Sequence, residues 1–361
     1  MVILQFIAGL VILVLGAEWL VRGASGLARR LGMSSLLIGL TIVAWGTSAP
    51  EMAVSAKASL LNQPDLTLGN IVGSNIFNIV AILGIAGIIT PLAVQRQLIR
   101  LDVPVMIGVS VLAAFFAWSG SVVAQWEGGA LLLLLLLYTG FLIWQSKREP
   151  KPLAGEESTG AGPRFMNHWL VQIGLCVIGI GALVLGSGWM VESAVVFAGA
   201  LGVSEMVIGV TLVAAGTSLP ELATSIVAAF RGERDIAVGN VVGSNVFNLL
   251  GVLGLSSLIA GGGVPVDAEV IGFHLPVMLA VAVVCFPIFL SGWEISRTEA
   301  ALFLCAYVVY LAVLIVDITK PEIISPAALA WGSWGAVAVA AAVAAWESVR
   351  FRARRRERLV E

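Results

Sequence analysis

Long apolar runs, separated by short groups of charged and turn-forming residues, dominate this chain of 361 residues. A helix that crosses a membrane needs roughly 20 consecutive apolar residues, and many runs approach that length. They predict helices over residues 2–21, 35–60, 68–90, 103–119, 128–145, 168–190, 205–229, 238–260, 271–290, 299–316 and 326–347. The pattern therefore predicts an all-α polytopic membrane protein.

One sequence unit occurs twice in the chain, at an offset of 170 positions. The segment GTSAPE, Gly46 to Glu51, returns as GTSLPE from Gly216 to Glu221, and GNIVGSNIFN from Gly69 returns as GNVVGSNVFN from Gly239. Each copy holds five predicted spans, so the second copy enters the membrane from the opposite side and the two repeats are inverted. We expect ten core helices and an eleventh at the C-terminus. The predicted parts are 1–146 (first repeat), 147–165 (linker), 166–318 (second repeat) and 319–361 (extra helix and basic tail).

The positive charges give the expected orientation. If the N-terminus is outside, 18 of the 20 Lys and Arg residues lie on the cytoplasmic side, and only Lys57 and Lys320 lie outside. Cytoplasmic loops carry such an excess of Lys and Arg. The sequence thus predicts a multi-pass protein of the plasma or inner membrane, with its N-terminus outside and its C-terminus in the cytoplasm.

The composition narrows the class of partner. Hydrophobic residues make up 59% of the chain and charged residues only 12%, which is too little charge for the surface of a soluble domain. The expected partner is the lipid bilayer. No basic stripe indicates nucleic acid, and no obligate protein partner is evident. An enzyme with a cofactor is not expected either, because the sequence holds no HExxH or GxSxG motif and only two histidines.

The first repeated motif brings a carboxylate into an apolar run. On a helix, Thr47 and Ser48 lie on the same face as Glu51, four and three positions away, and Pro50 disfavours a regular helix just before it. The motif from Thr217 and Ser218 to Glu221 repeats this arrangement. An ionisable residue inside a membrane span is costly and points to a functional site.

The second repeated motif adds neutral oxygen atoms. Ser74 and Asn78 are four positions apart, as are Ser244 and Asn248. Each motif alone has an ordinary structural explanation, since Ser and Thr in membrane helices often bond to their own backbone. Two copies of both, in register, favour a shared site. Carboxylate, hydroxyl and amide oxygens form the set that hard cations such as Ca²⁺ and Na⁺ prefer.

The two motifs resemble the alpha repeats of the cation/calcium exchanger superfamily, specifically its sodium/calcium exchanger type, over residues 1–320. The resemblance implies exchange of Na⁺ for Ca²⁺ by alternating access, with Glu51 and Glu221 as shared carboxylates. It further implies hydroxyl or carbonyl ligands from the remaining motif residues, backbone carbonyls from Ala44 and Ala214, and a central place for Asn78 and Asn248. The hydroxyl or carbonyl ligands that the resemblance implies are Thr47, Ser48, Ser74, Thr217, Ser218 and Ser244. Exchange of H⁺ for Ca²⁺ through the same carboxylates is the alternative.

Two further charged or titratable positions have ordinary explanations. Glu18 lies near the inner end of the first span, where an interfacial or paired charge is expected. His274 stands alone at the start of a span, and we expect an interfacial or hydrogen-bonded residue there.

Overall fold

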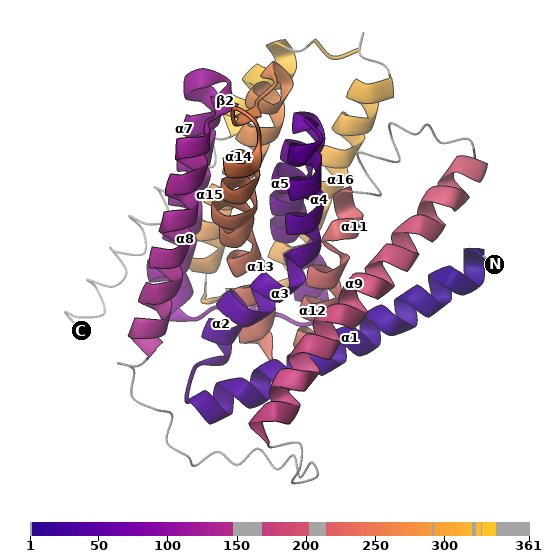
Figure 1. Ribbon diagram of the computed structural model, residues 1–361, viewed down its shortest axis with the longest axis vertical. Helices are drawn as coiled ribbons and strands as arrows, with labels where there is room; N and C mark the ends of the chain where they lie inside the picture. The colour runs from indigo at the N-terminus through magenta and orange to yellow at the C-terminus, as the bar shows by residue number, and fades with distance from the viewer. Residues whose placement is uncertain are drawn as a thin grey trace.

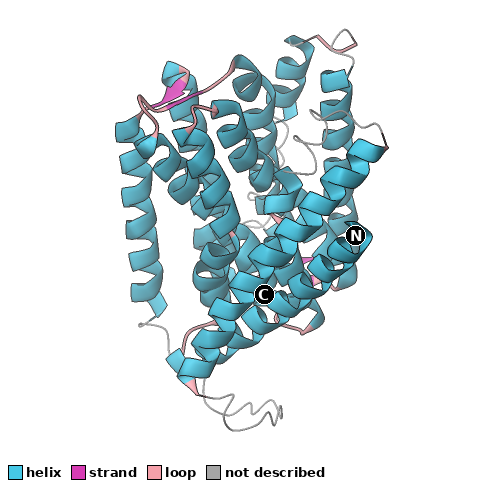
Figure 2. Ribbon diagram, turned by 45° about the vertical axis from the view of Figure 1, so that its right-hand side comes forward, coloured by secondary structure: helices cyan, strands magenta, loops and turns pink. Residues whose placement is uncertain are grey.

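The protein is helical in every part that can be described. The computed structural model describes residues 2–146, 168–201, 214–290, 292–319, 323–325 and 327–336. In these ranges helices predominate, and the strands are only two residues long (Figure 2). Within the described residues, eight helices are long and apolar enough to cross a membrane, or nine if the bent pair Ser35–Thr47 and Ala49–Leu60 is one span. The predicted all-α polytopic architecture is confirmed.

The first half of the chain begins with a long helix and contains three π-helical turns, which are labelled η. Its elements are α1 (Val2–Leu31), α2 (Ser35–Ile38), η1 (Gly39–Val43), α3 (Ala44–Thr47), α4 (Ala49–Leu60), α5 (Pro64–Ile76), η2 (Phe77–Ile82), α6 (Leu83–Ile89), β1 (Leu92–Ala93), η3 (Leu98–Asp102), α7 (Val103–Gly120), β2 (Val122–Val123) and α8 (Gln125–Ser146).

The second half follows the same order. Its described elements are α9 (Trp169–Ala200), α11 (Ala214–Thr217), α12 (Leu219–Phe230), α13 (Arg234–Phe247), η6 (Asn248–Val252), α14 (Leu253–Ile259), β3 (Val264–Pro265), η7 (Val270–His274), α15 (Leu275–Leu290), β4 (Glu294–Ile295) and α16 (Arg297–Thr319). The start of the predicted span 205–229 and the predicted linker lie outside the described residues. Of the predicted eleventh span, residues 327–336 are helical, and the rest also lies outside the described part.

Short strands join the two halves. β1 pairs antiparallel with β4, and Leu92 lies opposite Ile295. β2 pairs antiparallel with β3, and Val123 lies opposite Val264. Each pair therefore takes one strand from each half, so the connections before and after the fourth span of one half are joined to those of the other.

The predicted second span is bent at its centre. The helix Ser35–Thr47 and the helix Ala49–Leu60 meet at an angle of 45°, and Ser48 lies at the break. Pro50 occupies the first turn of α4, where its missing N–H costs no helical hydrogen bond. The sequence expectation of an interrupted helix at this motif agrees with the bend.

The two longest helices, α1 and α9, run side by side and cross the molecule obliquely (Figure 1). Glycines allow their backbones to touch. A Cβ atom at Gly16 would lie 2.8 Å from the Gly179 carbonyl oxygen, and one at Gly186 would lie 2.6 Å from the Leu13 nitrogen. Small residues at such positions let membrane helices approach closely, so this contact fixes the pairing of the two halves along much of both helices.

Burial distinguishes inner from outer helices. The apolar stretch of Arg234–Ile259 is entirely buried, whereas that of α16 is mostly exposed. Exposed residues on the outer helices include leucines, valines and phenylalanines, such as Leu136 on α8 and Leu302 on α16. An apolar outer surface is what lipid solvates, and the inner helices are left to hold the polar residues.

Candidate cation site

Two buried carboxylates lie at equivalent helix starts in the middle of the molecule. Glu51 is in the first turn of α4 and Glu221 in the first turn of α12, and each follows a proline. Both side chains are fully buried. The N-terminus of a helix presents unpaired N–H groups and a partial positive charge, which favours a carboxylate there.

Each carboxylate is held by a serine from the opposite half. The Ser48 hydroxyl donates to Oε1 of Glu221 over 2.8 Å, and the Ser218 hydroxyl donates to Oε1 of Glu51 over 2.9 Å. The Ser74 hydroxyl lies 2.9 Å from that of Ser218, and Ser244 faces the Glu221 carboxylate. The motif residues of the two repeats therefore meet in one place.

Two asparagines that are not among the expected ligands also form hydrogen bonds between the two halves. Thr217 donates to Oδ1 of Asn70 over 2.9 Å, and Thr47 donates to Oδ1 of Asn240 over 3.1 Å. The Nδ2 atom of each asparagine donates to the backbone carbonyl of the glutamate in its own half, Glu51 or Glu221, over 3.3 Å. Asn70 and Asn240 thus tie the threonine of one repeat to the carboxylate-bearing turn of the other.

Spacing alone could have identified these asparagines. Asn70 precedes Ser74 by four positions, as Ser74 precedes Asn78, so the three side chains share one face of a helix. The same series occurs at Asn240, Ser244 and Asn248. The polar face of each helix is therefore one turn longer than the Ser–Asn pair alone indicates.

A group of asparagines lies deeper in the same interior. Asn78 donates through Nδ2 to Oδ1 of Asn245 over 3.1 Å, and Asn248 is fully buried. Five oxygen atoms of the expected ligands have no hydrogen-bond partner among the described residues, namely Glu51 Oε2, Glu221 Oε2, Asn78 Oδ1, Ser244 Oγ and Asn248 Oδ1. Buried polar atoms without partners call for an explanation, and a desolvated cation is one that fits oxygen atoms.

The other expected ligands are placed as follows. The Ala44 carbonyl, at the start of α3, accepts the Ser48 N–H over 3.0 Å and the Thr47 hydroxyl over 3.3 Å. Ala214 begins α11, and its side chain is not described. All of the expected side-chain ligands are buried, and they come from both halves.

Close helix packing beside the motifs is observed on one side. A Cβ atom at Gly243 would lie 2.6 Å from the Leu40 carbonyl oxygen, and one at Gly239 would lie 2.8 Å from that of Leu36. At Gly69 and Gly73, no described atom comes within 4 Å. The equivalent partner segment, residues 206–210, lies outside the described residues, so close packing is seen for α13 only.

A buried site of oxygen ligands, shared between two repeats with interrupted helices, defines a membrane transporter for cations. Comparison with known proteins identifies the family. The profile of the family described as "Sodium/calcium exchanger protein" matches residues 1–144 and 171–316, so the chain belongs to this family. It is a multi-pass cation/calcium exchanger and not an enzyme.

The relatives support this assignment over nearly their full length. The sodium/calcium exchanger MaX1 of Methanosarcina acetivorans is 34% identical over 350 residues, covering 86% of this chain and 97% of that protein. The inner membrane protein YrbG of Escherichia coli is 37% identical over 317 residues, covering 85% and 95%. A structure of the sodium-calcium exchanger NCX_Mj, soaked with Na⁺ and Ca²⁺, superposes with a TM-score of 0.74 at 31% identity, covering 87% of this chain and 98% of that one.

Proposed function

We propose that this protein is a secondary antiporter that exchanges Na⁺ for Ca²⁺ at the site between Glu51 and Glu221. The observation that carries the proposal is the exchange of serines, in which each carboxylate is bound by the hydroxyl of the opposite half. A movement of one half against the other changes the surroundings of both carboxylates together. Such a site can be exposed to one side of the membrane at a time, as alternating access requires.

The charges of the site favour Ca²⁺ and Na⁺ as competing substrates. Two carboxylates balance one desolvated Ca²⁺, and the neutral ligands Ser74, Ser244, Asn78 and Asn248 add oxygen atoms without further charge. Hard cations take several oxygen ligands of this kind. Na⁺ ions at the same oxygen atoms would repel Ca²⁺ and displace it, and this competition is the basis of exchange.

Uptake into proteoliposomes tests the proposal. Vesicles that contain the purified protein are loaded with Na⁺, K⁺ or choline and diluted into medium with ⁴⁵Ca²⁺. We expect rapid uptake only with Na⁺ inside. Uptake that follows an imposed pH gradient without Na⁺ would instead assign H⁺/Ca²⁺ exchange through the same carboxylates, and uptake with neither gradient would overturn both.

We also propose that the exchange does not need K⁺. Positions 78 and 248 are both asparagine, so the described residues of the site provide no third negative charge for a further cation. The K⁺-dependent relatives match only part of the chain: the mouse sodium/potassium/calcium exchanger 3 is 33% identical over 114 residues, or 32% of this chain. Na⁺-driven uptake should be the same with and without K⁺. A strict K⁺ requirement would contradict the part given to Asn248.

The membrane orientation is a further proposal, which rests on the positive charges. With 18 of 20 Lys and Arg residues on one side, that side should be cytoplasmic. A cysteine placed at Ser121, after α7, should react with an impermeant reagent added from outside, and one at Ser158 should not. The reverse pattern would overturn the proposed orientation.

A further inference from the structure

A second pair of equivalent polar residues emerges when the two halves are aligned by structure. Two residues, Thr90 and Pro91, separate α6 from β1, whereas four, residues 260–263, separate α14 from β3. Equivalent positions therefore differ by 170 before this turn and by 172 after it. With the shift included, Asp102 corresponds to His274, and Tyr138 corresponds to Tyr310.

These four residues form the same contact twice. The Tyr138 hydroxyl donates to Oδ1 of Asp102 over 2.9 Å, and Nδ1 of His274 lies 3.0 Å from the Tyr310 hydroxyl. Asp102 is the last residue of η3 and His274 the last of η7. Both contacts join the fourth span of a half to the fifth. An acid in one half and a base in the other thus occupy one structural position.

Asp102 has no positive partner among the described residues. Its side chain is fully buried, and its Oδ2 atom has no hydrogen-bond partner there. The Gln97 amide faces it from the preceding turn. The charged residues of α13 are Arg234 and Asp235 at its start, and the side chain of Gln95 binds Asp235 over 2.6 Å. No acidic or basic residue occurs in α15.

His274 is in different surroundings. Its Nε2 atom lies 3.5 Å from Glu269, which is more than half exposed. Asp317 on α16 also acts on this histidine, and Tyr307 lies beside Tyr310. A proton on His274 therefore has a negatively charged residue nearby. Of the two equivalent residues, only Asp102, when ionised, would be a buried charge without a partner among the described residues.

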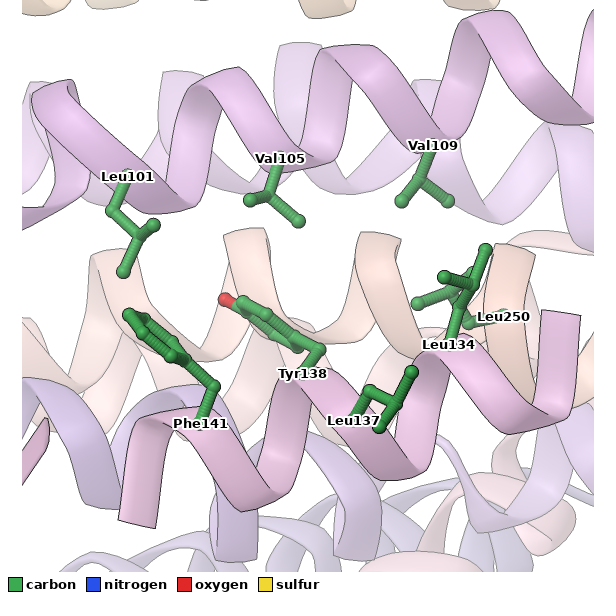
Figure 3. A pocket seen from close by; sticks show the side chains of 8 residues that line it. All are labelled: Leu101, Val105, Val109, Leu134, Leu137, Tyr138, Phe141 and Leu250. Carbon is green, nitrogen blue, oxygen red and sulfur yellow. The ribbon is translucent and has the colours of Figure 1, made fainter. Parts of the chain in front are cut away.

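The surroundings of Asp102 suit a proton and not a metal ion. A Ca²⁺ ion takes about six to eight oxygen ligands, whereas one carboxyl, one phenol and the Gln97 amide meet here. The groove beside them, of about 370 Å³, is lined by Tyr138 and otherwise by Leu, Val and Phe side chains such as Leu101 and Val105 (Figure 3). A buried carboxylate in such surroundings is neutralised by taking up a proton.

We propose that Asp102 is a proton-binding site within the membrane, separate from the cation site, and that its neutral acid is the form that packs between α7 and α8. The site has a route to the interior asparagines. Met106, one turn further along α7, has its Sδ atom 3.7 Å from Nδ2 of Asn245, and Asn245 accepts from Asn78. Loss of the proton would disturb α7 and through it this group.

Infrared spectroscopy of the full-length protein in lipid tests the proposal at mildly acidic pH, where exposed carboxylates are still ionised. A protonated buried acid gives a carbonyl stretching band that an ionised one lacks. Asp102→Asn should lose the intensity of one carboxylic acid, whereas Glu294→Gln, which removes an exposed carboxylate on β4, should not. Saturating Ca²⁺ should leave this band in place, which distinguishes it from any band of Glu51 or Glu221. An unchanged band in Asp102→Asn would overturn the proposal.

Two further measurements give an answer if Asp102→Asn folds poorly. Tyr138→Phe keeps the acid but removes its hydrogen bond, so the band should persist and shift to higher frequency; an unshifted band would contradict the assignment. A group that keeps its proton in the folded state loses stability as the pH rises. As the pH rises from about 4, where the unfolded acid ionises, toward the pKa of the folded acid, the melting temperature of the wild type and of Glu294→Gln should therefore decrease relative to that of Asp102→Asn, and parallel curves would contradict the proposal.

Discussion

Equivalent residues of the two halves find their hydrogen-bond partners in different ways in two regions of this molecule. At the candidate cation site, each half contributes the same residues, and their hydrogen bonds cross to the opposite half, as from Ser48 to Glu221 and from Ser218 to Glu51. At the second region, Asp102 bonds to Tyr138 and His274 to Tyr310, each within its own half. Where partners are exchanged, a change in one copy alters a contact of the other. Where both partners belong to one copy, the two copies can differ, and here one copy has an acid at the position where the other has a base.

The largest effect is expected when either carboxylate of the candidate cation site is removed. Glu51→Gln and Glu221→Gln should each lower Na⁺-driven Ca²⁺ uptake by about 100-fold or more, because an uncompensated buried charge costs ~3–5 kcal/mol and about 1.4 kcal/mol corresponds to a factor of ten. The double variant should be no worse than either single one, since both carboxylates act on the same ion. Glu294→Gln is the matched control. Wild-type-like uptake in one of the two Gln variants would show that the halves are not equivalent.

A smaller effect is expected from the crossing asparagines. Asn70→Ala and Asn240→Ala each remove bonds to a threonine of the other half and to a glutamate carbonyl. Leaving such buried groups unpaired costs about 1–3 kcal/mol, so the Ca²⁺ concentration for half-maximal uptake should rise roughly 5- to 100-fold. The two variants should agree within a few-fold, and Gln63→Ala, at the exposed start of α5, should behave as wild type. A large effect in one half only would break the equivalence.

The smallest effect concerns a charge contact that only one half has. Glu18 on α1 pairs with Arg22 at 2.6 Å and with Arg231 after α12, as expected for a paired charge. The position equivalent to Glu18 is Gly188, so the other half lacks this link. Because the groups are partly exposed, Arg231→Gln should lower the free energy of unfolding by at most about 1 kcal/mol. Thermal unfolding of both proteins should converge in high salt; a difference that salt leaves unchanged would exclude an ionic origin.

The sequence was sufficient for the repeats, the bent second span and the residues that meet around Glu51 and Glu221, because exact repetition marks them without knowledge of the fold. The four-residue spacing also places Asn70 and Asn240 on the polar face, but their hydrogen-bond partners in the opposite repeat are visible only once the halves are packed. The equivalence of Asp102 and His274 was missed for a different reason. Two additional residues in a glycine-rich turn shift the register, so a comparison at a fixed offset of 170 places Gly272 opposite Asp102.

Two of the π-helical turns of the first half have counterparts in the second half, which bears on how this chain evolved. A π turn contains one residue more than an α turn. The turns η2 and η6 include the equivalent residues Asn78 and Asn248, and η3 and η7 end at the equivalent residues Asp102 and His274. The simplest history places both insertions in an ancestral unit of five helices, before its gene was doubled. Doubling then gave the two inverted copies, the glycine-rich turn lengthened in one of them, and the acid and the base diverged at a position that both had inherited.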